Sequence, residues 1–247
     1  MLKEAAREHY QGLVAELLSC VLSRQPSIVR MLDFYEGLTP SSITGRRLFT
    51  EVCWIGYSAG FRYSVVMKYW PRITGALYNF NLDRVAAREV TVSEAASRIC
   101  EASGFRNMSK ASWCVENARR IPELDEEWSD IGGIRGFFEL LATERPDRLV
   151  KSAPAIVDQL GLKGIGRTTI FHLLKNVGID IFKPDIHVRR LIAHMDLVSS
   201  EDATPSEICD AMMFLSSVTG YRVSQLDTFL FAYGVVVGDD IPSVSSF

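Results

Sequence analysis

The sequence predicts an all-α protein. Apolar residues recur at helical spacing along nearly the whole chain, and convincing alternating strands are absent. The one short strand candidate is the segment 88–92. The hydrophobic fraction of 47% is typical of a globular protein, and 247 residues are enough for one large domain or two small lobes with a real core.

Apolar stripes and end signals define the helices. A first stripe runs along 13–22, and a second runs along 48–57 and ends near Gly60, since glycine often follows the last apolar residue of a helix. Proline in a first turn, or Ser, Thr or Asp just ahead of it, predicts several starts, Thr204-Pro205 among them. The remaining predicted helices are 63–69, 71–79, 82–88, 93–103, 110–121, 134–143, 146–152, 154–160, 167–176, 186–195, 205–217 and 222–237.

Charge and composition restrict the functional class. The formal charge of −3 and the pI near 5.9 argue against a strongly basic nucleic-acid binder, although a local basic face remains compatible with them. The N-terminus lacks the apolar core of a signal peptide, and no stretch has the length of a membrane span. We therefore expect a soluble intracellular protein, cytoplasmic or nucleoid-associated, with no membrane partner.

The cysteines predict neither a metal cage nor a disulfide framework. There are five of them, none at CxxC spacing, and an odd count fits a reducing compartment. Buried free thiols are the expected state. We expect no zinc site, no iron–sulfur cluster and no other bound metal.

The segment 162–168, Leu-Lys-Gly-Ile-Gly-Arg-Thr, predicts a tight glycine turn between two helices. Gly164 and Gly166 flank Ile165, and glycine allows a ligand to approach the backbone where a side chain would clash. The next helix is expected to begin near Arg167, so that its free N–H groups would bind a phosphate, helped by Thr168 and Lys163. The alternative is a simple helix connector. A dinucleotide fold is disfavoured because no strand precedes the glycines.

A second motif, Lys183-Pro184-Asp185-Ile186-His187-Val188-Arg189, follows after one helix length. It places one carboxylate, that of Asp185, at the start of a helix, where the positive end of the helix dipole favours the charged form. The alternative is that Asp185 is only a helix N-cap. An N-cap can also be a functional carboxylate, so the two roles are compatible. His187 is expected to pack, and Arg189 to pair with Asp185 or to lie on a solvated face together with Arg190.

Together the two motifs resemble the helix-hairpin-helix (HhH-GPD) DNA glycosylase superfamily. The segments 107–111 and 116–121 are also similar to a recurrent helix of that superfamily, and the resemblance covers roughly residues 45 to 237. It implies a two-lobed helical fold with a central cleft. One lobe would span 45–178 and hold the hairpin, and the other would combine 1–44 with 179–247 and carry Asp185 at the junction.

The resemblance also implies an activity. Asp185 would be the catalytic residue, and Lys163, Gly164, Ile165, Gly166, Arg167 and Thr168 would bind double-stranded DNA that carries a damaged base. Bifunctional relatives have a lysine where this chain has Thr168, which implies a monofunctional base-excision repair glycosylase without efficient lyase activity. Iron–sulfur relatives have four cysteines after the acid, whereas only Cys209 follows Asp185 here. No cofactor is therefore expected, except for a monovalent cation at the hairpin carbonyls.

An everted base needs an aromatic pocket, and 54–63 is the best candidate. Trp54, Tyr57, Phe61 and Tyr63 are the proposed lining, with ordinary core packing as the alternative. The segment is weakly similar to the helix-turn-helix of type I 3-methyladenine glycosylases, but their glutamate, near Ile55, and their structural zinc do not appear. The lesion stays open among oxidised, alkylated and deaminated bases. The rival functions are a non-catalytic helix-hairpin-helix DNA-binding protein and a glycosidase acting on RNA or modified nucleosides. Protein partners and oligomeric state are not predicted.

Overall fold

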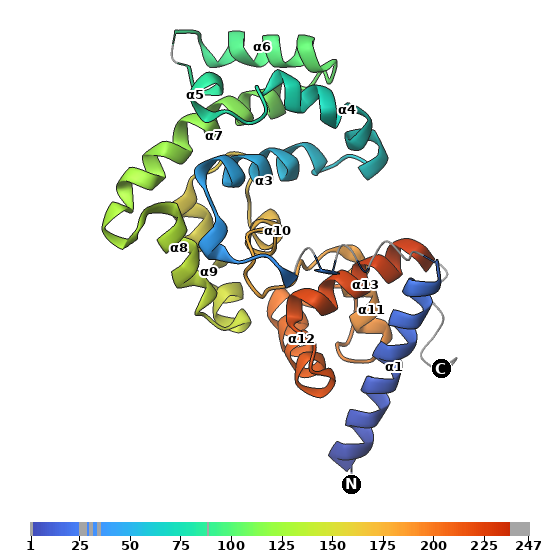
Figure 1. Cartoon of the computed structure of the whole chain (residues 1–247). Coiled ribbons are helices and arrows are strands. Elements are labelled where there is room, and N and C mark those ends of the chain that lie inside the picture. Colours follow the sequence, from blue (N-terminus) through green and yellow to red (C-terminus); the bar gives the residue numbers. More distant parts are fainter. Residues whose placement is uncertain (1, 25–28, 30–31, 34–35, 88, 238–247) are drawn as a thin grey trace. The chain divides into compact units, whose positions relative to one another are not determined.

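The computed structural model describes residues 2–24, 29, 32–33, 36–87 and 89–237, and all regular structure within them is helical (Figure 1). The all-α prediction is therefore confirmed for the described chain. Of the strand candidate at 88–92, Arg88 lies outside the described residues, and 89–91 form a turn and bend that lead into helix α6 at Val92. No helix in these ranges is long and apolar enough to cross a membrane.

The chain divides into two compact units. Unit 1 consists of Met1–Leu38, Ala142–Ser152 and Leu174–Phe247, and unit 2 consists of Thr39–Leu141 and Ala153–Leu173. These bounds differ from the expected lobes, because the segments 142–152 and 174–178 belong to the unit that carries the termini, and 39–44 belongs to the other unit. Two of the boundaries, at 152/153 and 173/174, fall inside α9 (Pro146–Leu160) and α10 (Thr169–Asn176), so no loop or change in composition marks them.

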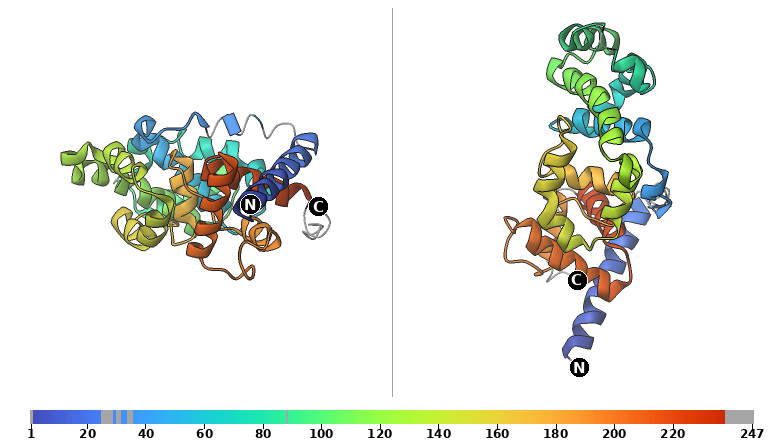
Figure 2. Two further views of the ribbon diagram at one scale, coloured as in Figure 1. Left: turned by 90° about the horizontal axis from the view of Figure 1, so that it is seen from below. Right: turned by 90° about the vertical axis from the view of Figure 1, so that its left-hand side faces the viewer.

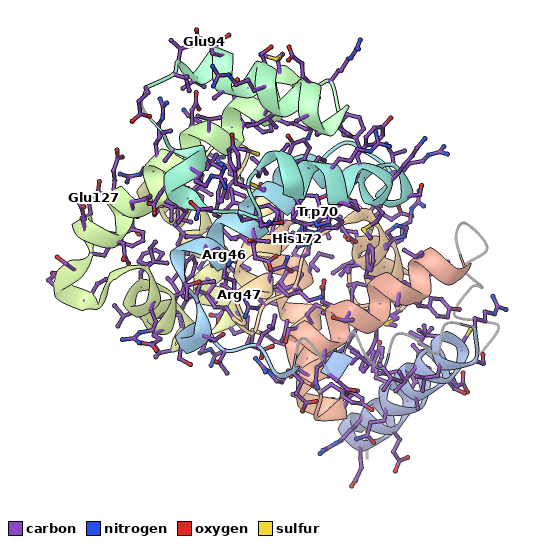
Figure 3. The ribbon with its side chains drawn as sticks, turned by 45° about the horizontal axis from the view of Figure 1, so that its top comes forward. Arg46, Arg47, Trp70, Glu94, Glu127 and His172 are labelled. Atoms are coloured by element: carbon purple, nitrogen blue, oxygen red, sulfur yellow. The ribbon has the colours of Figure 1, made fainter. Side chains whose placement is uncertain are left out.

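Unit 2 is built around α7 (Met108–Glu127), which packs against three other helices and buries Ala111, Val115 and Ile121. Its partners are α3 (Gly45–Ser58), α5 (Leu82–Val85) and α6 (Val92–Ser103), and α4 (Tyr63–Ala76) packs on α6. The unit also contains the short 3-10 helices η1 (Pro40–Ser42) and η2 (Ser129–Ile131), and α8 (Gly133–Ala142). Figure 3 shows Trp70 on α4 and Glu94 at the start of α6.

Unit 1 is built around the apolar helix α13 (Val223–Val237), which packs against α1 (Leu2–Arg24), α11 (Ile186–His194) and α12 (Pro205–Thr219). Figure 2 shows α1 beside α13 from two further directions. Gly234 sets the spacing between α13 and α11. A Cβ atom at Gly234 would lie only 2.7 Å from Cβ of His187, so only glycine allows this approach.

Three predicted helix boundaries at prolines are wrong. Pro71 lies inside α4, Pro154 inside α9 and Pro122 inside α7. Proline removes one helical hydrogen bond and costs roughly 3 kcal/mol in a helix interior. Around Pro122 the buried side chains of Ile121 and Leu124 hold both flanks of α7 in the core, and packing of this kind overrides the local preference.

The helix starts that the capping residues predicted are confirmed at two places. Thr204 caps α12 ahead of Pro205 and forms a capping box with Glu207, and Asp185 caps α11. A further capping box joins Thr91 and Glu94 at α6. Each fixes where a helix begins, because a side-chain oxygen accepts a hydrogen bond from an otherwise unpaired backbone N–H.

Candidate functional site

The glycine turn joins α9 to α10 within unit 2 and is held from beneath by Asn117. The buried Asn117 side chain accepts a hydrogen bond from the Lys163 backbone N–H at 2.7 Å, and its Nδ2 donates to the Lys163 carbonyl at 2.9 Å. Ile165 is buried and anchors the tip of the turn in the core. One amide side chain from α7 thus fixes both backbone groups of the residue that precedes Gly164.

The two glycines of the turn have different reasons to be glycine. Gly164 has φ of +79°, and a Cβ atom there would lie 2.8 Å from Cε3 of Trp113, so both backbone and packing require it. At Gly166 φ is not positive, and a Cβ would meet nothing within 4 Å. Among the described residues, nothing therefore requires glycine at 166, and the space beside its Cα is open.

The turn presents backbone donors to its outer side. Residues Gly164 to Thr169 line a hollow of about 420 Å³, and Arg167 and Thr168 are exposed. Among the described residues, no hydrogen bond joins the N–H groups of Arg167 and Thr168 to a protein acceptor. The Thr169 hydroxyl accepts from the Gly166 N–H at 2.7 Å and contacts the Gly164 carbonyl at 3.2 Å. α10 begins at Thr169 rather than near Arg167, and the Ile170 N–H donates to the Gly166 carbonyl at 2.9 Å.

Asp185, in unit 1, uses its two carboxylate oxygens differently. Oδ1 accepts from the backbone N–H groups of His187 at 3.0 Å and Val188 at 3.1 Å, which makes Asp185 the N-cap of α11. Oδ2 lies 3.7 Å from Nζ of Lys183, and the Asp185 side chain keeps 14% of its surface exposed. The helix start thus fixes the direction of the carboxylate, while one oxygen has no backbone partner.

A buried ion pair supports the segment that carries Asp185. Asp227 on α13 contacts the ammonium of Lys175, and its other oxygen accepts from the Lys183 backbone N–H at 2.9 Å. Burial raises the pKa of Asp227, and the negative charge of Asp185 adds to this, while Lys175 and the Lys183 N–H oppose it. Breaking this pair would leave an uncompensated charge in the core.

An aromatic ring lies beside Lys183. Phe231 on α13 is 38% exposed, with Nζ of Lys183 at 6.0 Å from its ring centroid and the His187 ring edge-on at 5.6 Å. Ile186 is also exposed. His187 on α11 thus packs against α13, as expected, and the accessible ring of Phe231 lies beside Lys183, the residue whose ammonium is near Asp185.

The two arginines that follow Asp185 contact the loop after α11. Arg189 donates from Nε to the Pro184 carbonyl at 3.0 Å and bridges to the Glu201 carbonyl at 3.4 Å. Nε of Arg190 lies 3.3 Å from a carboxylate oxygen of Glu201. Of the two alternatives for Arg189, a pair with Asp185 or a solvated face, neither describes its contacts, because the Pro184 carbonyl and the following loop supply acceptors for the guanidinium.

The proposed base-pocket aromatics, in unit 2, divide into core and surface. Tyr57 has no exposed surface and packs edge-on against Trp70 and Phe105, so it belongs to the core, which corrects its assignment to a pocket wall. Trp54 is half-buried and packs against Trp70 at 4.9 Å. Phe61 is 40% exposed. The side chain of Tyr63 lies outside the part that the structure describes.

The cysteines are free thiols, and all but Cys20 are buried. In the described ranges no group of three or more His, Cys, Asp or Glu side chains is arranged to hold a metal ion.

Sequence comparison finds no matching family model and no matching curated protein. Structure comparison finds the 8-oxoguanine DNA glycosylase of Thermotoga maritima, with a TM-score of 0.59 and 18% sequence identity. The superposition covers 93% of this chain and 98% of that one. Nearly the whole of each chain is matched, so this protein has the helical fold of that DNA glycosylase.

Proposed function

We propose that the protein is a DNA glycosylase that hydrolyses the N-glycosidic bond of a damaged base in double-stranded DNA, as in base-excision repair. The observation that carries the proposal is the Asp185 carboxylate, which two backbone N–H groups orient while Oδ2 has no backbone partner. The fold supports it, because the similar structure is that of a DNA glycosylase.

The chemistry follows from the charge that builds on the sugar. As the bond to the base breaks, C1′ and the ring oxygen become positively charged, and an ionised carboxylate nearby stabilises that charge. The same carboxylate can orient the attacking water and accept its proton. The product is an abasic site, with the DNA strand intact.

The glycine turn would hold the DNA backbone. Its unpaired N–H groups at Arg167 and Thr168 suit a phosphate oxygen, and the open space at Gly166 leaves room for it. Such contacts fix the strand without reading its sequence. Phe231, which the sequence reasoning missed, offers an exposed ring beside Lys183 on which a base could stack.

The reaction would be monofunctional. Thr168 occupies the place at which a lysine would form a Schiff base, so water is the expected nucleophile. We propose no resident cofactor. A monovalent cation at the turn would use carbonyls such as those of Gly164 and Gly166, each of which contacts only the Thr169 hydroxyl among side chains of the described chain.

The test is base release from a panel of lesion duplexes, with 8-oxoguanine first, because the similar structure is named for that base. Alkylated and deaminated bases follow. Wild type, Asp185→Asn and the exposed control Asp158→Asn are incubated with each duplex, and abasic sites are cleaved with hot alkali. We expect product from wild type and Asp158→Asn, and at least about 100-fold less from Asp185→Asn.

Other outcomes assign the rival functions. If the protein binds duplexes but releases no base from any lesion, it is a non-catalytic DNA-binding protein. If it hydrolyses free modified nucleosides or RNA, it is a different glycosidase. Strand cleavage before alkali would contradict the monofunctional assignment. The variant Lys183→Ala would then show whether the Lys183 amine, which lies beside Asp185, is the nucleophile for strand cleavage.

A further inference from the structure

Unit 2 contains a cavity that is lined by neither the glycine turn nor the proposed base-pocket aromatics. Its volume is about 610 Å³, within the range of small-molecule sites. The walls come from α4, α5, α6 and the segments between them. The lining residues are Arg72, Gly75, Ala76, Tyr78, Arg84, Val85, Ala87, Glu89, Val90, Ala95, Arg98, Ile99 and Ala102.

The charged groups of this cavity are mainly cationic. Three arginines, Arg72, Arg84 and Arg98, line it together with one acidic residue, Glu89. Among the described residues, none of the three forms an ion pair with a carboxylate, and Arg98 has an electrostatic interaction with Glu94 on the same helix. Guanidinium groups are planar fork donors that match the oxygens of a phosphate. An anionic ligand would therefore balance the charge of the site.

A strained turn presents Tyr78 to the cavity. Tyr78, Asn79 and Phe80 have φ of 52°, 54° and 59°, a left-handed conformation that costs roughly 1–2 kcal/mol for each residue other than glycine. Phe80 is buried against Phe49 and Trp70, and Arg46 donates to the Asn79 carbonyl at 2.8 Å. These contacts hold the turn in place.

The result of this turn is an exposed aromatic platform. Tyr78 keeps 44% of its surface exposed, and the Arg84 guanidinium lies 4.1 Å from its ring centroid. The guanidinium carbon thus lies over the face of the ring in a cation–π contact, and an exposed aromatic ring of this kind can stack on a nucleobase. The rest of the lining is largely apolar, with Val85, Val90 and Ile99 among its members.

We propose that this cavity binds a nucleoside 5′-monophosphate unit. The base would stack on the Tyr78–Arg84 pair, and the phosphate would bind the guanidiniums of Arg72 and Arg98. The unit could be a free nucleotide or the phosphorylated end of a single strand. The site shares no residue with the glycine turn or with the Asp185 segment, so it does not depend on the proposed function.

The test is calorimetric titration of the full-length protein with dGMP and, separately, with a 5′-phosphorylated single-stranded octamer. Deoxyguanosine and inorganic phosphate are the probes that lack one half of the unit. The variants are Arg98→Gln, Tyr78→Leu and, as the matched loss of charge, Arg135→Gln, an exposed arginine on α8 outside the cavity. Thermal unfolding verifies that each variant is folded.

We expect dGMP to bind more tightly than either half probe, and Arg98→Gln and Tyr78→Leu each to weaken it about tenfold or more. Arg135→Gln should bind like wild type. Tighter binding of the octamer would assign the site to strand ends, and tighter binding of dGMP to free nucleotides. The proposal is overturned if neither probe binds, if deoxyguanosine binds as well as dGMP, or if folded Arg98→Gln binds like wild type.

Discussion

The glycine turn and the Asp185 segment are held in place by different physical means. Neutral contacts fix the turn: the Asn117 amide, the Thr169 hydroxyl and the packing of Gly164 on Trp113. Charges fix the Asp185 segment: Asp227 joins the Lys175 ammonium and the Lys183 backbone. Backbone N–H groups carry no net charge, so the surface that we propose to bind the DNA backbone is held by neutral contacts. A buried carboxylate, by contrast, needs a charged partner.

The largest expected loss of stability comes from breaking the ion pair between Asp227 and Lys175. Asp227→Ala removes the carboxylate that contacts the buried Lys175 ammonium and that accepts from the Lys183 N–H, so we expect the free energy of unfolding to fall by about 3–5 kcal/mol. Urea denaturation measures this. The double variant Lys175→Met/Asp227→Leu should recover most of the loss, because it removes both charges. If the double variant is as unstable as Asp227→Ala, the broken ion pair does not explain the loss of stability.

The next effect concerns the turn itself. Gly164→Ala places alanine in a left-handed conformation and against the Trp113 ring. We therefore expect the free energy of unfolding to fall by about 2–4 kcal/mol. Denaturant unfolding of Gly164→Ala beside Gly164→Ala/Trp113→Leu separates the two causes. A stability equal to that of wild type would contradict the requirement for glycine at 164.

The hydrogen bonds between the Asn117 amide and the Lys163 backbone are expected to contribute less to the free energy of unfolding. Asn117→Ala removes both hydrogen bonds to Lys163 and leaves its backbone unpaired, which costs about 1–3 kcal/mol. The turn should also become more mobile, and hydrogen exchange at residues 162–168 would report this as faster exchange. Exchange that is faster everywhere, rather than at the turn, would show a general loss of stability instead.

Gly166→Ala provides the sharpest contrast with Gly164→Ala. A Cβ atom at 166 would lie within 4 Å of no other atom among the described residues. The free energy of unfolding should therefore change by no more than about 1 kcal/mol. Affinity for duplex DNA should fall, since the methyl group would occupy the space that the phosphate needs. Fluorescence anisotropy with a labelled duplex measures this. Unchanged affinity would mean that DNA does not approach the turn at this point.

The smallest effect is a pH dependence that both units share. Hydrogen bonds from the backbone N–H and hydroxyl of Thr91 and Thr204 lower the pKa of Glu94 and Glu207, respectively. Their stabilisation is therefore complete above the unfolded pKa and is lost as the pH falls through the folded one. The Tm difference between wild type and Glu94→Gln/Glu207→Gln should shrink from pH 7 to below pH 4. A difference that does not vary with pH would exclude this linkage.

The sequence alone determined the features that local chemistry specifies. Helical periodicity predicted the fold class, and the capping residues at Thr204 and Asp185 predicted two helix starts. Gly164, Ile165 and Gly166 predicted a turn because their conformational and apolar character is a property of the residues themselves. The prolines at 71, 122 and 154 misled, since packing along α4, α7 and α9 outweighs one lost hydrogen bond.

Tertiary structure alone decided which distant side chains support these motifs. Asn117 lies 46 residues before Lys163, and Asp227 lies 44 residues after Lys183, so no local pattern connects them. The same holds for Phe231 beside Lys183 and for the burial of Tyr57, which a helical stripe of aromatics cannot distinguish from a pocket wall. A residue's conformational preference is encoded locally, whereas burial and charge pairing depend on which elements the folded chain brings together.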